Sequence, residues 1–214
     1  MLKSSKFGRA LNSFRQNESG VAITEFALGL PVFITLMVGG LEYANLANSH
    51  MRVSQIAMTV ADNAGRYDPS IDESDINELV AAADVVGESI DFLANGRVVL
   101  SSLQHNGEID SDEGQVINWQ RCFGDLAVVS SYGVENDGET DSSLADGMGE
   151  TGNKIVAADG TAVMFVEVTY DYTPFFPGVI PAKQLRYESA FNVRSRNVFD
   201  ITNAGGLTVN DCTV

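Results

Sequence analysis

Apolar residues divide the chain into a long N-terminal helix and a mixed domain. Residues 21–41 contain a single charged residue, Glu25. As a helix, this run of 21 residues is about 31 Å long, which matches the hydrocarbon thickness of a bilayer. Residues 42–67 then place apolar side chains three and four positions apart, as is typical of an amphipathic helix. We therefore expect one helix with a transmembrane half, 21–41, and a second half, 42–67, that packs on a domain formed by residues 68–214.

The pattern in the domain predicts one short helix and two pairs of strands. Residues 72–93 are amphipathic, with acidic residues in the first turn, where the helix dipole favours them. Residues 97–108 and 115–124 predict one hairpin, and residues 162–196 predict a second pair of strands around a proline-rich turn. The fold class is therefore α+β, a long helix packed on an antiparallel sheet. The candidate core positions of the first hairpin are Val98, Leu100, Leu103, Val116, Ile117 and Trp119. In the second pair, one face of the first strand is formed by alternating residues, Met164, Val166, Val168 and Tyr170, and the returning strand alternates in the same way at Leu185, Tyr187, Ser189, Phe191 and Val193.

Charge is distributed unevenly along the chain. Residues 1–20 contain four basic residues and one acidic residue, a net charge of +3, and the rest carries −19, which gives −16 in total. The positive-inside rule places such a basic leader in the cytoplasm and the domain on the other side of the membrane. An acidic domain is repelled by phosphate, so we expect no nucleic acid partner. A secretory signal peptide is the alternative, but the apolar run is longer than usual and no small-x-small cleavage site follows it.

The two cysteines, Cys122 and Cys212, allow two interpretations. In the cytosol they would be a reduced pair, whereas in an exported domain they would form a disulfide. His50 and His105 are the only histidines and lie in unrelated segments, and no CxxC occurs, so we expect no metal site and no cofactor. Signatures of hydrolases, phosphate-binding loops and zinc proteases are also missing, which predicts that the protein is not an enzyme.

The acidic segment 135–154 also allows two interpretations. Its acidic and glycine residues are typical of a solvated loop. The alternative is a calcium-binding loop, but Ser142 and Met148 stand where an EF-hand needs glycine and a bidentate carboxylate. We therefore favour the solvated loop.

The order of a basic leader, Gly20, Val21, Glu25, Phe26 and an apolar helix resembles the N-terminus of a type IV prepilin. This resemblance implies that a prepilin peptidase cuts between Gly20 and Val21 on the cytoplasmic side. It also implies that Glu25 and Phe26 serve recognition and assembly. A carboxylate one turn from the new α-ammonium of Val21 can neutralise that charge in its own or an adjacent subunit.

The stretch "GVAITEFALGLPVF" further resembles the TadE-like pseudopilins of the tight-adherence (Tad, or Flp) pilus system. The shared features are a glutamate followed by an aromatic residue and alanine, here Glu25, Phe26 and Ala27, and a proline within the apolar run, Pro31. Tyrosine is common in the family at the position of Phe26. The C-terminal half is similar too, since a strand ending in Tyr-x-Tyr-x-Pro is followed by "FFPG" and a returning strand.

The resemblance implies a pilin-like fold and a role as a minor pilin or pseudopilin in the assembly of an adhesive type IV pilus. Its implied partners are the prepilin peptidase, other pilins and inner-membrane assembly proteins. The protein would cross the bacterial inner membrane once, with its domain in the periplasm. An uncleaved, membrane-anchored periplasmic binding or sensor domain is the alternative. For the proline-rich turn, residues 173–182, packing against the sheet and contact with another pilin subunit both stay open.

Overall fold

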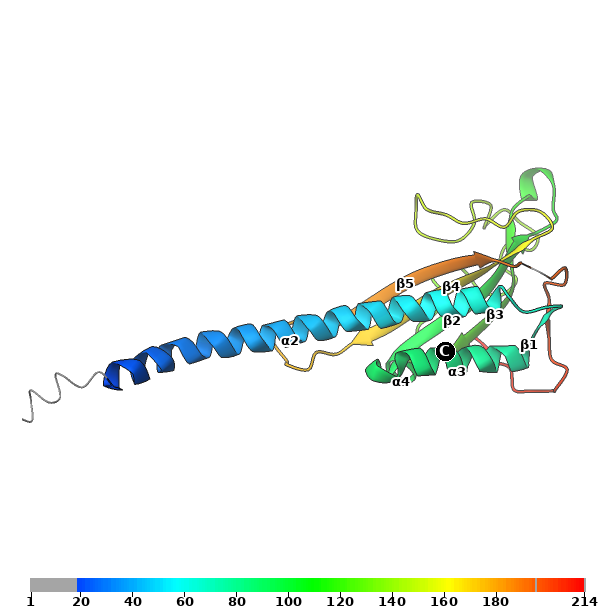
Figure 1. Ribbon diagram of the computed structural model, residues 1–214. Helices are drawn as coiled ribbons and strands as arrows, with labels where there is room; N and C mark the ends of the chain where they lie inside the picture. The colour runs from blue at the N-terminus through cyan, green and yellow to red at the C-terminus, as the bar shows by residue number, and fades with distance from the viewer. Residues whose placement is uncertain (1–18, 195, 214) are drawn as a thin grey trace, which may run out of the picture.

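A single helix dominates the computed structural model, which describes residues 19–194 and 196–213 (Figure 1). Helix α2, Ser19–Ala64, runs for 46 residues without interruption. Pro31 cannot donate a backbone hydrogen bond, yet the helix continues through it and through Gly39 and Gly40. The predicted joining of the two halves into one helix is thus confirmed. Except for its last two residues, the predicted leader 1–20 lies outside the described residues.

A four-stranded antiparallel sheet forms the centre of the domain. Its strands are β2, Gly96–His105, β3, Gln115–Phe123, β4, Ala162–Tyr172, and β5, Lys183–Asn192, in the order β3-β2-β4-β5. All neighbouring pairs are antiparallel. A short parallel pair, β1, Ile71–Asp72, and β6, Ile201–Thr202, lies apart from this sheet. The expected α+β class is therefore correct.

The predicted helix 72–93 is shorter than its pattern suggests. Helix α3 spans Glu73–Gly87, and the 3-10 turn η1, Glu88–Ile90, and helix α4, Phe92–Asn95, follow it. The break comes at Asp91, whose φ of 50° places it in the left-handed region. A second 3-10 turn, η2, spans Asp110–Asp112. At the start of α3, Asp72 and Asp75 form a capping box: the Ser74 amide donates to Asp72 Oδ1 at 3.0 Å and the Asp72 amide donates to Asp75 Oδ2 at 2.8 Å.

The main core lies between the sheet and the two long helices. The second half of α2 and helix α3 cover the same face of the sheet, where Val98, Leu100, Met164 and Val166 are fully buried (Figure 1). Each fully buried aliphatic side chain contributes about 1.5–3 kcal/mol to the stability of the fold, so the buried apolar residues of α2 fix the helix to the domain. The buried residues that α2 supplies are Val53, Ile56, Ala57, Val60, Ala61 and Ala64.

The sheet is also buried on its opposite face, which the sequence did not indicate. There Leu103, Ile117, Val163 and Phe165 form a second core. Leu103 faces this side by simple alternation with Leu100. Ile117 faces it because Asn118 is an extra residue on β3, between the pairs Trp119–Ser102 and Ile117–Leu103. The predicted core positions of the first hairpin are thus buried, but they divide between two cores.

The acidic segment 135–154 is a largely exposed loop, as expected, but a few of its residues cover this second face of the sheet. Met148 is fully buried, and it pairs with Ile155 through backbone hydrogen bonds of 3.0 and 2.7 Å. Ala157, also buried, completes the cover, and Leu144 packs beside it. The acidic residues between them point outward, whereas the few apolar residues reach the sheet. Met148, which argued against a calcium loop, is a core residue.

The C-terminal segment is tied to β3. Cys122 and Cys212 form a disulfide with a Cα–Cα distance of 4.8 Å and 90 residues between them in the chain. The Cys122 amide donates to the Asn210 carbonyl oxygen at 2.9 Å. Residues after β6 are therefore fixed along the edge strand β3 by a covalent bond and by main-chain contact.

Candidate functional site

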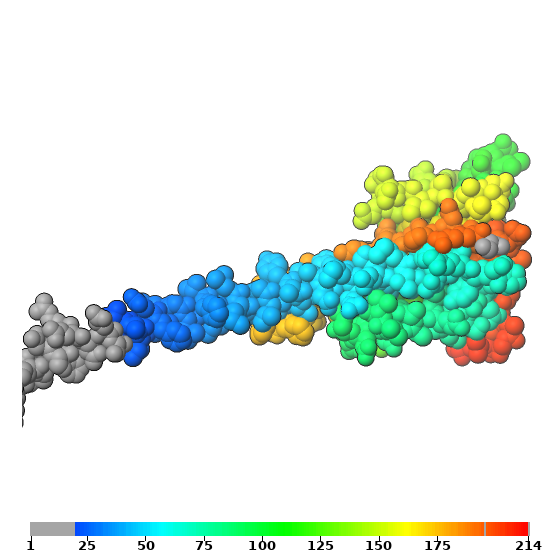
Figure 2. Space-filling view, viewed as in Figure 1, coloured from blue at the N-terminus to red at the C-terminus, as the bar shows by residue number. Residues whose placement is uncertain are grey.

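Most of the first half of α2 projects from the domain and is not buried by it (Figure 2). Every residue from Gly20 to Met37 is exposed, and the most apolar stretch of the helix has no buried residue. This helix is long and apolar enough to cross a membrane. In water such a surface would be strongly unfavourable, so the exposed half of α2 requires lipid or other apolar helices around it.

The residues implied in processing and assembly lie together at the free end of this helix. Gly20 and Val21 are in its first turn, and Glu25 follows Val21 by four residues, on the same face. Phe26 is 68% exposed. None of the four is buried against the domain. The hydroxyl of Thr24 donates to the Val21 carbonyl oxygen at 2.8 Å, which satisfies this polar group without an external partner.

Nothing in the fold requires glycine at position 20. A Cβ added there would meet no atom within 4 Å, and the φ angle is not in the left-handed region. Glycine nevertheless lowers helix propensity by about 1 kcal/mol relative to alanine. Gly29, Gly39 and Gly40 stand in equally open space. The fold therefore gives no packing reason for glycine at any of these four positions.

A buried carboxylate lies where the projecting half of α2 meets the domain. Glu42, the first residue after the apolar run, is 0% exposed. It accepts hydrogen bonds from the Tyr172 hydroxyl, from the Phe176 amide at 2.8 Å and from the Phe175 amide at 3.3 Å. The Asn45 amide group donates to the Tyr172 hydroxyl at 3.1 Å. Glu42 thus attaches the segment after β4 to the helix.

Burial acts to raise the pKa of Glu42, but its hydrogen bonds from Tyr172, Phe176 and Phe175 outweigh that effect and leave the pKa lowered. The group is therefore charged at neutral pH. Sequence reasoning missed this residue. The available signal was its position directly after the apolar run, together with the tyrosine and phenylalanine residues near the predicted proline-rich turn.

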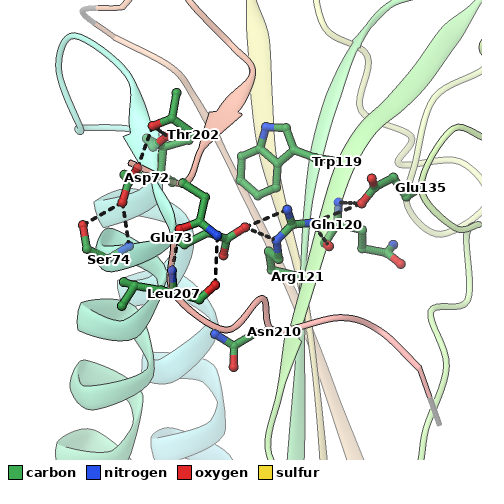
Figure 3. Close-up of polar contacts among 12 residues, drawn as sticks. Asp72, Glu73, Ser74, Trp119, Gln120, Arg121, Glu135, Thr202, Leu207 and Asn210 are labelled. Carbon is green, nitrogen blue, oxygen red and sulfur yellow. Dashed lines mark hydrogen bonds and ion pairs between the residues drawn. The ribbon is translucent and has the colours of Figure 1, made fainter. Parts of the chain in front are cut away.

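A second buried charge cluster joins α3 to β3 (Figure 3). Arg121 donates to Glu73 Oε1 from Nε at 2.8 Å and from a terminal nitrogen at 2.7 Å. Its other terminal nitrogen contacts Glu135 at 3.1 Å and the Gln120 carbonyl oxygen at 2.7 Å. Glu73 Oε2 is buried without a hydrogen-bond partner. This cluster lies at the end of the domain that is remote from the exposed half of α2. It connects α3 and β3 with the acidic segment.

The geometry of the described residues offers no group of three or more His, Cys, Asp or Glu side chains positioned to bind a metal ion.

Comparison with known proteins yields one similarity. The model of the family of TadE-like proteins matches residues 20–62. No curated protein and no solved structure is similar enough to the chain to count as a match. The matched range begins at Gly20 and includes the whole exposed half of α2 and nearly all of its docked half. Over residues 20–62 the chain is therefore similar to TadE-like proteins.

Proposed function

We propose that this protein is a minor pilin or pseudopilin that takes part in assembling a Tad-type pilus. The observation that supports this most directly is the division of α2. Its first half is an apolar helix without a partner in the domain, and its second half is built into the domain core. Such a helix anchors the subunit in the membrane and offers a surface for the helices of other subunits. The similarity of residues 20–62 to TadE-like proteins supports the same role.

In this proposal a prepilin peptidase removes residues 1–20 on the cytoplasmic side. Gly20 is exposed and has open space around it, so the junction with Val21 is accessible to a peptidase. Cleavage would create an α-ammonium at Val21, one helical turn from Glu25. An unpaired charge near the start of a span costs a few kcal/mol, so pairing the ammonium with a carboxylate favours insertion and packing. Glu25 would neutralise the amine of its own subunit or of a neighbour.

The proposed location is the inner membrane, with a single span and the domain in the periplasm. The basic leader favours this orientation. The disulfide between Cys122 and Cys212 is in keeping with an oxidising compartment. The domain would act through contacts with other pilus proteins, and we propose no enzymatic activity and no cofactor for it.

Processing is tested by a matched pair of substitutions. Gly20→Leu and Gly29→Leu make the same chemical change, at two positions of α2 that both have open space around them. With the cognate peptidase present, the wild type and Gly29→Leu should lose residues 1–20, whereas Gly20→Leu should keep them. Intact mass and N-terminal sequencing of the membrane-bound protein give the answer. A wild type that retains Met1 would indicate an uncleaved anchor for a periplasmic binding or sensor domain.

A further inference from the structure

The segment between β4 and β5 lies beside α2 at Glu42, directly after the apolar residues 21–41. Figure 2 shows it in orange below α2, reaching along the helix beyond the rest of the domain. Its backbone is held there by Glu42, which accepts from the Phe175 and Phe176 amides. If residues 21–41 fill the hydrocarbon region, Glu42 marks the outer boundary of that region. The segment is thus placed at the level of the membrane surface.

This segment exposes apolar side chains and no charge. Residues 173–182 contain no Asp, Glu, Lys or Arg, and Phe175 is 73% exposed, Phe176 39% and Val179 42%. In a domain that otherwise carries many acidic residues, this patch would be out of place in water. Aromatic side chains are enriched at membrane surfaces, because the ring is accommodated at the boundary between headgroups and acyl chains.

The segment also has a defined conformation. The Val179 amide donates to the Phe176 carbonyl oxygen at 3.2 Å, which closes a turn with Pro177 and Gly178 in its central positions. Gly178 has a φ of 94°, a value that a type II turn requires at its third residue and that glycine adopts without strain. Ile180 is buried and fixes the returning side of the turn. The exposed side chains therefore project from a hydrogen-bonded turn of defined conformation.

We infer that Phe175, Phe176 and Val179 insert into the outer boundary of the lipid bilayer and act as a second, shallow contact with the membrane. This contact lies beside the span formed by residues 21–41. The ligand is the lipid surface itself, because the patch is continuous with the span and is uncharged. Together with α2 it sets how deep the domain sits and prevents the domain from rolling about the helix axis. The inference rests on the membrane anchoring proposed above.

Depth-dependent fluorescence quenching tests the inference on the full chain. The protein is reconstituted in vesicles of phosphatidylethanolamine and phosphatidylglycerol with brominated acyl chains. Trp119, the only native tryptophan, is 2% exposed and supplies a constant background. The test variant is Phe175→Trp. Phe33→Trp reports on the span, and Ile109→Trp, at a 74% exposed position in the loop between β2 and β3, reports on the side of the domain remote from the membrane.

Phe175→Trp should lose most of its added emission to bromines near the headgroup end of the chains and shift to shorter wavelength. Phe33→Trp should be quenched by deeper bromines, and Ile109→Trp should not be quenched. Unquenched Phe175→Trp beside quenched Phe33→Trp would overturn the inference, and would point to contact with another subunit or with water. Unquenched Phe33→Trp would contradict the membrane span itself, and with it both the proposed function and this inference.

Discussion

Glu42 on α2 accepts a hydrogen bond from the hydroxyl of Tyr172, a residue 130 positions later at the end of β4. The same carboxylate also holds the amides of Phe175 and Phe176. One side chain on the helix thus satisfies three donors from the segment that leaves the sheet. The apolar half of α2 is therefore joined to the domain by a buried polar contact.

Replacing Glu42 should loosen that joint while the sheet stays folded. Glu42→Leu leaves the Tyr172 hydroxyl and the two amides without their acceptor, and an unsatisfied buried donor is costly. We expect faster hydrogen exchange at the Phe175 and Phe176 amides and a lower unfolding temperature. Glu42→Gln keeps a carbonyl acceptor and should lie between Leu and the wild type. Exchange measured by mass spectrometry on the detergent-solubilised protein decides this. Unchanged protection in the Leu variant would contradict the assigned contact.

Breaking the ion pair between Arg121 and Glu73 should destabilise the domain strongly. The side chains are 9% and 2% exposed, so Arg121→Met leaves a buried carboxylate without its cation. Loss of one partner of a buried pair costs about 3–5 kcal/mol. Denaturant unfolding of Arg121→Met, Glu73→Leu and the double variant gives the coupling energy. The double variant should be more stable than Arg121→Met alone. If the losses in unfolding free energy of the two single variants simply add in the double variant, the pair is not coupled.

Asp72 should make the stability of the domain depend on acid pH. Its Oδ1 caps α3 through Ser74, and its Oδ2 accepts from the Thr202 hydroxyl at 2.8 Å and from the Ala204 amide at 2.9 Å. The backbone hydrogen bonds from Ala204 and Ser74, followed by that of the Thr202 side chain, lower the pKa of Asp72. A lowered folded-state pKa stabilises the fold above the unfolded value, and this stabilisation is lost as the pH falls toward the folded one.

Asp72→Asn therefore separates charge from capping. Asparagine still caps a helix but has a single acceptor oxygen, so it cannot serve Ser74 and residues 202–204 together. The unfolding temperature of the variant should lie below that of the wild type at pH 7. The gap should narrow as the pH falls below the ordinary aspartate value of 3.8. A gap that is constant between pH 7 and pH 3 would mean that the charge of Asp72 contributes nothing.

Glu25→Gln should separate membrane insertion from pilus assembly. Removing a charge from the span makes insertion easier, so the abundance in the membrane should be normal. Pilus production should fail, because the Val21 amine would stay unneutralised between packed helices. The experiment is complementation of a deletion strain, scoring surface fibres and membrane abundance separately. Thr24→Val, in the same helical turn, is the control and should support fibres. Fibre numbers equal to the wild type in Glu25→Gln would refute the assembly role.

The disulfide predicts the state of both thiols in exported protein. Alkylation of the denatured, unreduced protein should label neither Cys122 nor Cys212, and reduction should expose both. A double Cys→Ala variant should lose about 2–5 kcal/mol of stability, since a bridge that spans 90 residues restricts the unfolded chain. Free thiols in periplasmic material would contradict the proposed location.

The sequence predicted the parts of the fold that depend on local periodicity. The length of α2, the strands and the burial of Trp119 all follow from repeating patterns that neighbouring residues share. It did not predict contacts that depend on distant partners. Glu73 was expected to serve the dipole of α3, but it is the buried partner of Arg121, 48 residues away. The burial of Glu42 and of Met148 was not predicted for the same reason, because it depends on contacts with segments that are distant in the sequence.

The bond between Cys122 and Cys212 also determines how the subunit responds to pulling. The residues between these two cysteines, including β4 and β5, form a covalent ring. Tension applied at Cys212 passes through the sulfur atoms directly to β3 and bypasses that ring. A load between the C-terminal segment and the membrane helix therefore cannot stretch out β4 or β5 by drawing on the chain from that end. Under mechanical force, strand β4, which leads to the turn at residues 176–179, is shielded, and the first element to bear the load is β3.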